Sequence, residues 1–337
     1  MKNKTGVLLV NLGTPDSPST PDVRKYLTEF LNDPRVIDIP WLLRKMLVNL
    51  IIVPFRAPKS AKIYQKLWTK DGSPLMIHGN EVKEKLQQSL SDEFDVYLGM
   101  RYQNPSLETV LGVMQKKNYN KIIVVPLFAQ YASASTGSAL EKVMQIISKW
   151  YVIPELKFIS QYYDNAGYIN AFVERGKQYN FNEYDHILFS YHGLPVRQVD
   201  KVYGDSPCTD HNCEEHVDDD NKYCYKATCY ETTRLIAKQL NIPKEKYSVA
   251  FQSRLDKKWL EPFSDKVVAQ KAKEGAKKLL VFSPAFVADC LETIIEIGDE
   301  YNEIFKEHGG EKVQLVESLN SHPIWIHALK EMVMKNS

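Results

Sequence analysis

The sequence predicts an α/β fold made of two similar halves, each with a four-stranded parallel sheet. Short, β-branched apolar runs alternate with amphipathic helical patterns along the chain, as in strand–helix–strand units. Several runs are continuously hydrophobic, which is typical of parallel strands covered on both faces. A chain of 337 residues is also long enough for two ordinary α/β domains. We expect the halves to join near residues 150–165.

Eight apolar runs are expected to form the strands, four in each half. They cover residues 7–11, 95–100, 121–127, 156–160, 186–191, 247–252, 278–282 and 313–317. The helical patterns between them supply the crossovers that parallel strands need. We place the first domain at residues 1–155, the second at residues 156–320 and a closing helix at residues 321–337.

The composition is typical of a soluble globular protein, with 44% hydrophobic and 25% charged residues. A net charge of +1 gives no electrostatic reason to expect a nucleic acid as partner. No uncharged run reaches the roughly 18 residues that span a membrane, and the first apolar run is too short for a secretory signal. We therefore expect a cytoplasmic protein in a reducing compartment.

Ligands of open parallel sheets gather beyond the carboxyl ends of the strands, so we looked for polar residues there. The first turn, Asn11-Leu-Gly-Thr-Pro15, lacks the further glycines of a dinucleotide site, and no P-loop motif occurs, so no nucleotide is expected. The second strand places Arg101 and Tyr102 at this rim, where the arginine could clamp a carboxylate or pair with a structural acid. His192 follows the fifth strand and could be a base, a metal ligand or a structural residue.

Residues 283–300 follow the seventh strand and are expected to form an amphipathic α-helix. At 100° per residue, one stripe of this helix is acidic and comprises Glu292, Glu296, Asp299 and Glu303. The strand thus delivers a row of carboxylates at its carboxyl end. The alternative is structural: Asp289 would be an N-cap, Glu292 its capping-box partner, and the remaining acids a solvated face.

Residues 39–56 are dense in large apolar side chains but include Arg44, Lys45 and Asn49. A buried helix between the domains is one interpretation. The other is an apolar lip that touches a bilayer surface or covers an apolar ligand, with Arg44, Lys45 or Arg56 available for acidic groups. Composition leaves both interpretations open.

Four of the five cysteines are crowded into 22 residues with the spacing C-x4-C-x10-C-x4-C. They are Cys208, Cys213, Cys224 and Cys229. Four soft ligands could enclose zinc or a [2Fe–2S] cluster, and the spacing does not select between them. The alternative is an acidic solvated loop with incidental thiols. A helix expected at residues 225–240 would anchor half of such a site.

Seven motifs, taken together, resemble one family. They are Asn11-Leu-Gly-Thr-Pro15, Gly72-Ser-Pro74, Arg101-Tyr102, Gln130-Tyr131 with Ser135-Thr-Gly-Ser138, Ser190-Tyr-His-Gly-Leu-Pro195, Phe251-Gln-Ser-Arg254 with Trp259-Leu260, and Phe286-Val-Ala-Asp-Cys-Leu-Glu-Thr293. The chain closely resembles the ferrochelatases, which insert Fe(II) into protoporphyrin IX in the last step of haem synthesis. The resemblance runs through nearly the whole chain in order.

The resemblance implies two Rossmann-like, chelatase-like domains around a porphyrin cleft, and no nucleotide. It also implies peripheral association with the inner membrane, with residues 39–56 as the lip of the porphyrin pocket, and the upstream protoporphyrinogen oxidase as a candidate partner. His192 and Glu292 match the residues taken to bind the metal and remove protons. Glu296 is expected as a secondary metal ligand, and Glu296 and Asp289 continue an acidic path. The residues expected to contact the porphyrin are Leu12, Arg56, Arg101, Tyr102 and Trp259.

Three features distinguish this chain within the resemblance. Cys290 stands where many relatives have a second histidine, so a mechanism that needs two histidines is in doubt. Leu12 replaces the tyrosine of coproporphyrin-using relatives, which favours protoporphyrin IX. Residues 207–229 form a cysteine-rich insertion, and because some microbial ferrochelatases carry a [2Fe–2S] cluster, the resemblance favours a cluster over zinc.

Two other functions compete with the leading one. A cobalt chelatase of corrinoid synthesis would bind a substrate with many carboxylates and would therefore need a polar, basic lip. The apolar residues Trp41, Leu42, Leu43 and Ile51 argue against it. A protein that binds haem or metal without catalysis would keep its porphyrin affinity when His192 is removed.

Overall fold

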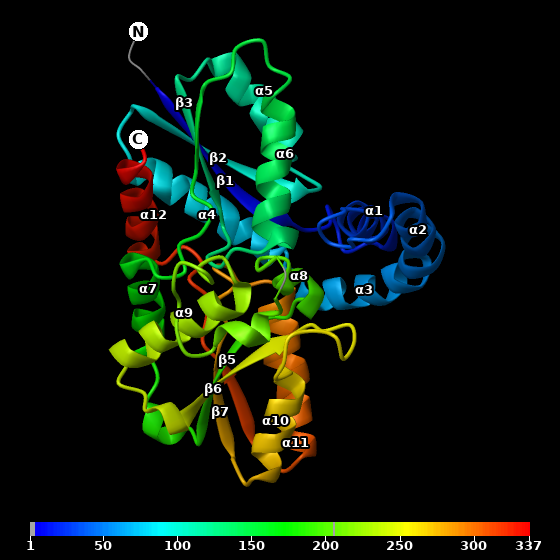
Figure 1. Ribbon diagram of the computed structural model, residues 1–337, viewed down its shortest axis with the longest axis vertical. Helices are drawn as coiled ribbons and strands as arrows, with labels where there is room; N and C mark the ends of the chain where they lie inside the picture. Colours follow the sequence, from blue (N-terminus) through cyan, green and yellow to red (C-terminus); the bar gives the residue numbers. More distant parts are fainter. Residues whose placement is uncertain (1–3, 205) are drawn as a thin grey trace. The chain divides into compact units, whose positions relative to one another are not determined.

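The computed structural model describes residues 4–204 and 206–337, so residues 1–3 of the first expected domain lie outside it. The chain divides into two compact units. The first contains Met1–Phe128, Ala132–Ser160 and Ile326–Ser337, and the second contains Ala129–Tyr131 and Gln161–Trp325. Each unit is built around its own four-stranded sheet (Figure 1).

The sheet of the first unit has the strand order β2-β1-β3-β4, and every pairing is parallel. Its strands are β1 (Thr5–Gly13), β2 (Phe94–Tyr102), β3 (Lys121–Pro126) and β4 (Glu155–Phe158). Strand β1 lies in the middle of the sheet and is almost entirely buried, as its continuous apolar run predicts. The four strands expected in this half are confirmed.

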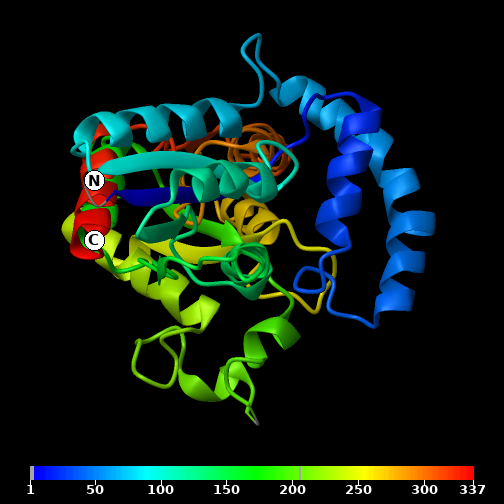
Figure 2. The same cartoon turned by 90° about the horizontal axis from the view of Figure 1, so that it is seen from above.

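Helices cover both faces of this sheet (Figure 2). They are α4 (Pro74–Ser89), α5 (Leu107–Lys117) and α6 (Ser138–Ile147), the last preceded by the π-helical turn η2 (Ser133–Gly137). Alternate residues of a strand point to opposite faces. Leu8 and Val10 of β1 therefore pack with α5 and α6, whereas Leu98 of β2 contacts α4 at Gly79.

Four helical segments of the first unit lie apart from its sheet in both views (Figures 1 and 2). They are α1 (Thr20–Leu31), α2 (Trp41–Met46), the π-helix η1 (Leu47–Ile52) and α3 (Val53–Leu67). A small core that includes Val23, Leu27, Ala57 and Ala61 holds them together, and Tyr102 at the end of β2 joins it to the sheet. Residues 39–56 thus belong to a helical projection that is anchored at the end of β2.

The second unit repeats this connectivity. Its strand order is β6-β5-β7-β8, again parallel throughout. The strands are β5 (His186–His192), β6 (Tyr247–Gln252), β7 (Lys278–Phe282) and β8 (Lys312–Leu315). These confirm the four strands expected in the second half, and β5 is buried from His186 to Tyr191.

The helices of the second unit also cover both faces of its sheet. They are α7 (Ala166–Gly176), α8 (Val196–Asp200), α9 (Tyr225–Gln239), α10 (Ser264–Lys273), the π-helix η6 (Glu292–Tyr301) and α11 (Asn302–Glu307), with 3-10 turns η3 (Phe181–Glu183), η4 (Cys208–His211) and η5 (Lys244–Lys246). The last helix is α12 (Pro323–Lys335), which only begins in this unit. Leu188 and Val281 pack with α10, η6 and α11. Helix α12 passes into the first unit at Ile326.

One expected element has a different geometry. Residues 292–301 form a π-helix instead of an α-helix, so their backbone bonds span five residues instead of four. The side chains therefore advance by a smaller angle per residue, and the predicted acidic stripe is not continuous. Glu292 and Glu296 are half-buried, whereas Asp299 and Glu303 are exposed to solvent.

Candidate functional site

The candidate site lies at the carboxyl ends of β5 and β6 in the second unit. These strands run side by side, and His192 is the register partner of Gln252. The Gly193 N–H donates to the Gln252 carbonyl at 2.7 Å, which closes the end of the ladder. The parallel sheet thus presents His192 at the edge where ligands of α/β folds bind.

His192 is half-buried between two aromatic side chains. Its ring centroid lies 6.4 Å from that of Trp259 and 6.3 Å from that of Phe286. Its Nδ1 is 2.6 Å from the Gly193 carbonyl oxygen. Because a carbonyl only accepts, Nδ1 carries the hydrogen in this contact, and the Nε2 of a neutral ring is left as the acceptor. His192 can therefore take up a proton or bind a metal ion through Nε2.

Glu292 begins η6 and is half-buried. Its main-chain carbonyl accepts a hydrogen bond from Gln252 Nε2 at 3.0 Å. The neighbouring Cys290 is buried, and burial together with the negative charge of Glu292 raises the pKa of its thiol well above the ordinary value. Cys290 therefore stays a neutral thiol beside the Glu292 carboxylate.

Glu296 lies one turn further along η6 and is held by four donors. Its Oε1 accepts from the Ser253 N–H at 2.8 Å and from the Tyr301 hydroxyl at 3.2 Å. Its Oε2 accepts from Gln252 Nε2 at 3.0 Å and from the Ser253 hydroxyl at 2.5 Å. The carboxylate is thus fixed to the end of β6.

Asp289 belongs to a buried hydrogen-bond network. Its carboxylate accepts from Asn320 Nδ2 at 2.7 Å and from the Thr293 hydroxyl at 3.0 Å. Its own N–H donates to Asn320 Oδ1 at 2.8 Å. The predicted capping box is therefore wrong, because the Asp289 N–H that Glu292 would have accepted from is bound by Asn320.

The other residues expected to contact a porphyrin lie in the first unit. Arg101 Nη2 donates to Asp33 Oδ2 at 2.5 Å, and the Tyr102 hydroxyl donates to the same oxygen at 2.9 Å. Burial alone would raise the pKa of Asp33, but hydrogen bonds from Ser138 and the Arg35 N–H and the charge of Arg101 lower it below the ordinary value. Arg101 thus pairs with a structural acid, the second of the two roles considered for it.

Leu12 and Arg56, which are also expected to contact the porphyrin, lie in different surroundings in the first unit. Leu12 is half-buried and packs on the core that holds α1 and α3 together. Arg56 is exposed on α3.

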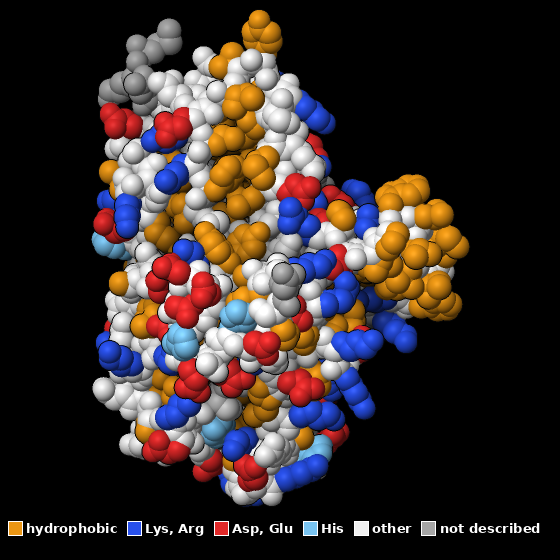
Figure 3. All heavy atoms as spheres, viewed as in Figure 1, with side chains coloured by type: hydrophobic (Ala, Val, Ile, Leu, Met, Phe, Trp, Pro, Cys, Tyr) orange, Lys and Arg blue, Asp and Glu red, His pale blue; other side chains and the backbone are white. Residues whose placement is uncertain are grey.

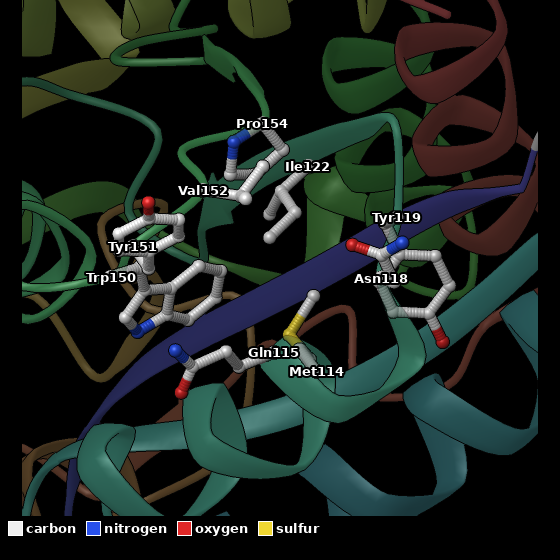
Figure 4. Close-up of a pocket in the computed structure, with 9 residues that line it drawn as sticks. All are labelled: Met114, Gln115, Asn118, Tyr119, Ile122, Trp150, Tyr151, Val152 and Pro154. Carbon is white, nitrogen blue, oxygen red and sulfur yellow. The ribbon is translucent and has the colours of Figure 1, made fainter.

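A small cavity of about 200 Å³ occurs in the first unit, where α5 ends beside the start of β3 (Figure 4). Met114, Ile122 and Trp150 line it, and none of the predicted site residues does. Binding pockets for organic ligands typically measure about 300–1,000 Å³, so this cavity is too small for a porphyrin.

Three of the four predicted cysteine ligands converge. The thiol sulfurs of Cys208, Cys213 and Cys224 lie within 4.8 Å of one another, and all three residues are buried. The Cys208 sulfur is 3.4 Å from that of Cys213 and 3.5 Å from that of Cys224. Within the part of the chain that the structure describes, Cys229 is not a member of this group.

The chemistry of the three thiols fits a soft metal centre. Hydrogen bonds from Cys208 and Cys213 lower the pKa of the Cys224 thiol, whereas the pKa values of Cys208 and Cys213 are raised. The group therefore holds one thiolate, which is the form that binds metal, beside two neutral thiols. The sulfur separations are close to the roughly 3.8 Å between two ligands of a tetrahedral thiolate-bound zinc ion. Cys229 lies inside α9, fully buried, and burial raises the pKa of its thiol well above the ordinary value. The trio supplies three of the four thiolates that a [2Fe–2S] cluster takes.

Sequence reasoning missed three residues around His192. Phe286 forms one of the two aromatic walls, and Gln252 and Ser253 bind Glu296. A usable signal was present, because Gln252 and Ser253 end a strand that neighbours the His192 strand. The rule that directs attention to strand ends applies to them equally.

Comparisons with known proteins agree on one family. The family model Ferrochelatase matches residues 4–337. The ferrochelatase of Coxiella burnetii (strain Dugway 5J108-111) is 45% identical over 338 residues, which cover 99% of this chain and 94% of the relative. The ferrochelatase of Legionella pneumophila (strain Paris) is 44% identical over 331 residues, which cover 98% of both chains.

Solved structures share the fold. SirB from Bacillus subtilis with Fe3+ aligns with a TM-score of 0.57 at 12% identity, over 98% of this chain and 95% of that one. The sirohydrochlorin chelatase SirB from Bacillus subtilis subspecies spizizenii, in complex with cobalt, aligns with a TM-score of 0.54 at 12% identity, over 98% and 94% of the two chains. At such low identity the likeness concerns the fold alone.

Proposed function

Because this chain belongs to the ferrochelatase family, we propose that it inserts Fe(II) into protoporphyrin IX to form protohaem, with His192 and Glu292 as the reacting residues. One observation carries the assignment of these residues. Gln252 binds the N–H of Gly193, next to His192, and the carbonyl of Glu292, so one buried residue links both candidates. This link between the backbones on either side supports a shared site for the His192 ring and the Glu292 carboxylate.

The reaction gives each residue type a task. Two pyrrole protons must leave the porphyrin as Fe(II) enters, and the flat ring shields its nitrogens from a hydrated ion. The Nε2 of His192 offers the lone pair that accepts a pyrrole proton. The Glu292 carboxylate offers the incoming Fe(II) oxygen ligands and compensates its charge. Trp259 and Phe286 offer apolar faces to the ring beside His192, so that binding energy can offset ring distortion.

Anaerobic incubation with Fe(II) and protoporphyrin IX tests this function. The four-band spectrum of the free porphyrin should convert to that of haem. We expect His192→Ala and Glu292→Gln to lower kcat by at least about 100-fold, while His327→Ala, at an exposed histidine, leaves kcat unchanged. Porphyrin that stays bound but unconverted by the wild type would indicate a carrier instead.

We assign peripheral membrane contact to residues 41–55. Seven large apolar side chains on α2, η1 and the start of α3 are exposed (Figure 3). They are Trp41, Leu42, Leu43, Met46, Leu50, Ile51 and Phe55. Arg56, Lys59 and Lys62 follow, also exposed, and such a combination suits an anionic lipid surface. None of the helices in the described residues is long and apolar enough to cross a bilayer.

Exposure of these side chains in the first unit favours an apolar lip over the buried helix considered for residues 39–56. An apolar lip remains, and its composition suits protoporphyrin IX better than a substrate with many carboxylates. Contact with protoporphyrinogen oxidase stays a prediction.

We assign a thiolate metal centre to Cys208, Cys213 and Cys224. Their convergence supports it, and a [2Fe–2S] cluster remains the centre that the sequence favours. When bound, such a centre would tie η4 (Cys208–His211) to the start of α9, since Cys208 begins η4 and Cys224 is the N-cap of α9.

A further inference from the structure

We infer that Gln252 is a positioning residue for metal insertion, because it fixes Glu292 relative to His192 and commits Glu296 to a role other than binding iron. The inference rests on the proposed function, since it concerns the geometry of the two proposed reacting residues. It is carried by the contacts of three neighbouring elements, β5, β6 and η6.

Every polar atom of the Gln252 side chain is in use. Its Oε1 accepts from the Ser190 hydroxyl on β5 at 2.7 Å. Its Nε2 donates to the Glu292 carbonyl and to Glu296 Oε2, both at 3.0 Å. Gln252 is 1% exposed, so water cannot replace these bonds. One amide therefore joins the strand that ends in His192 to the helix that begins with Glu292.

The orientation of this amide is also determined. A flipped Gln252 would direct its carbonyl oxygen at the Glu296 carboxylate and at the Glu292 carbonyl, which are both acceptors. Three acceptor oxygens would then face one another in a buried site without a donor between them, which lowers the stability of the folded state. Only the observed orientation pairs every group.

Glu296 has no acceptor position left for a metal ion. A carboxylate offers about four lone-pair sites, and four donors occupy them, two from Ser253, one from Gln252 and one from Tyr301. Binding iron would have to displace one of these donors. Glu296 therefore acts as a fixed anion that anchors η6 to β6, and the metal-binding carboxylate of this helix is Glu292.

The test compares two buried glutamines of the second unit. Gln252→Met keeps the size of the side chain and removes its hydrogen bonds. Gln130→Met is the control at a second buried glutamine, because Gln130 is 2% exposed and donates to Thr232 Oγ1 at 2.9 Å, outside the site. The Oε1 of Gln130 accepts no hydrogen bond within the described residues, so we expect Gln130→Met to lose less thermal stability than Gln252→Met. Loss of a residue that orients a metal ligand typically lowers activity by about 10- to 100-fold. We therefore expect kcat to fall by about that factor in Gln252→Met and to stay unchanged in Gln130→Met. The KM of Gln252→Met for protoporphyrin IX should stay within about twofold of the wild-type value.

Ser190→Ala serves as a milder variant if Gln252→Met does not fold. It removes the one hydroxyl that orients Oε1, and a smaller loss in kcat with unchanged KM is expected. The inference is overturned if Gln252→Met and Gln130→Met show equal kcat, or if Ser190→Ala raises KM and leaves kcat intact. A wild type that inserts no iron would refute the proposed function instead, so the two failures are distinguishable.

Discussion

At the scale of single residues, Ser253 combines an unusual backbone conformation with two bonds to one carboxylate. Its φ is 61°, in the left-handed region that a side chain disfavours. Its N–H and hydroxyl bind the two different oxygens of Glu296. Strain of this kind persists where the surroundings determine the conformation, often at functional sites. The two hydrogen bonds from Ser253 to Glu296 offset the strain of this conformation.

This conformation leads to a stability prediction. Ser253→Ala and Ser253→Gly both lose the hydroxyl bond to Glu296, but only glycine relieves the left-handed strain. We expect Ser253→Gly to exceed Ser253→Ala in free energy of unfolding by about 1 kcal/mol, measured by urea denaturation. The control pair is Asn241→Ala and Asn241→Gly, because Asn241 is exposed and also has a positive φ, of 55°. Equal stability of the two Ser253 variants would contradict the strain.

Single residues also differ in how far the sequence predicts them. His192 follows a recognisable strand, so its place at the sheet edge could be predicted from local pattern. The partners of Glu296 could not, because Gln252 and Ser253 meet it across more than 40 positions of the chain. The pairing of Arg101 with Asp33 is equally non-local, with 68 positions between them.

At the scale of elements, the eight strands could be predicted from short apolar runs, several of them continuous, as in β1 and β5. The type of η6 could not. The apolar pattern of residues 292–301 fits the α-helical repeat of 3.6 residues, so local sequence predicts an α-helix there. The choice depends on contacts such as those of Glu292 and Glu296 with β6, which local sequence does not contain.

The helical projection of the first unit gives a prediction about membranes. Leu50→Glu and Phe55→Glu place carboxylates on its exposed apolar surface, where each residue is more than half exposed. Charge there should weaken contact with lipid, so sedimentation with anionic vesicles should fall by about tenfold or more. Val113→Glu and Met144→Glu alter exposed apolar residues of α5 and α6. These controls should sediment like the wild type, and equal losses in all four would refute a specific lip.

The cysteine-rich segment gives a prediction about metal content. Serine at Cys208, Cys213 or Cys224 removes one of three converging thiols and should abolish metal binding in anaerobically purified protein. Cys229→Ser should retain the metal, because Cys229 is not among the three converging thiols of the described residues.

Visible absorption with stoichiometric iron and sulfide would identify a [2Fe–2S] cluster in this segment, and a colourless zinc-containing protein would identify a structural zinc site. Metal loss in Cys229→Ser would show that Cys229 is a ligand after all. A wild-type protein that contains no metal and has free thiols would indicate that the cysteines bind no metal.

At the scale of the whole molecule, the two units repeat one connectivity, with orders β2-β1-β3-β4 and β6-β5-β7-β8. The sequence predicts this repetition because each crossover is a local strand–helix–strand unit. The two sheets nevertheless differ in what their strand ends carry. β5 ends in His192 within reach of Trp259 and Phe286, whereas β2 ends in Tyr102, whose hydroxyl is bound by a structural acid.

Global stability should depend on pH through His186, at the start of β5. Burial, followed by the charge of Lys271, lowers the pKa of His186 to about 4, while Glu274 opposes the shift. Its ordinary pKa is about 6.5, so between pH 6.5 and pH 4 the unfolded chain binds a proton that the folded chain does not. The folded state therefore loses stability as pH falls through this window, by about 2 kcal/mol between pH 7 and pH 5.

His186→Gln should remove this dependence, since glutamine can still bond to Ser248, the partner of His186 Nε2 at 2.9 Å, and does not titrate. We expect the difference in free energy of unfolding between pH 7 and pH 5, measured by urea denaturation, to be smaller in this variant by about 2 kcal/mol. His327→Gln, at an exposed histidine, should behave like the wild type. Glutamine cannot be protonated in this pH range. If His186→Gln retained the full difference in free energy of unfolding, the acid sensitivity of the protein would therefore arise from groups other than His186.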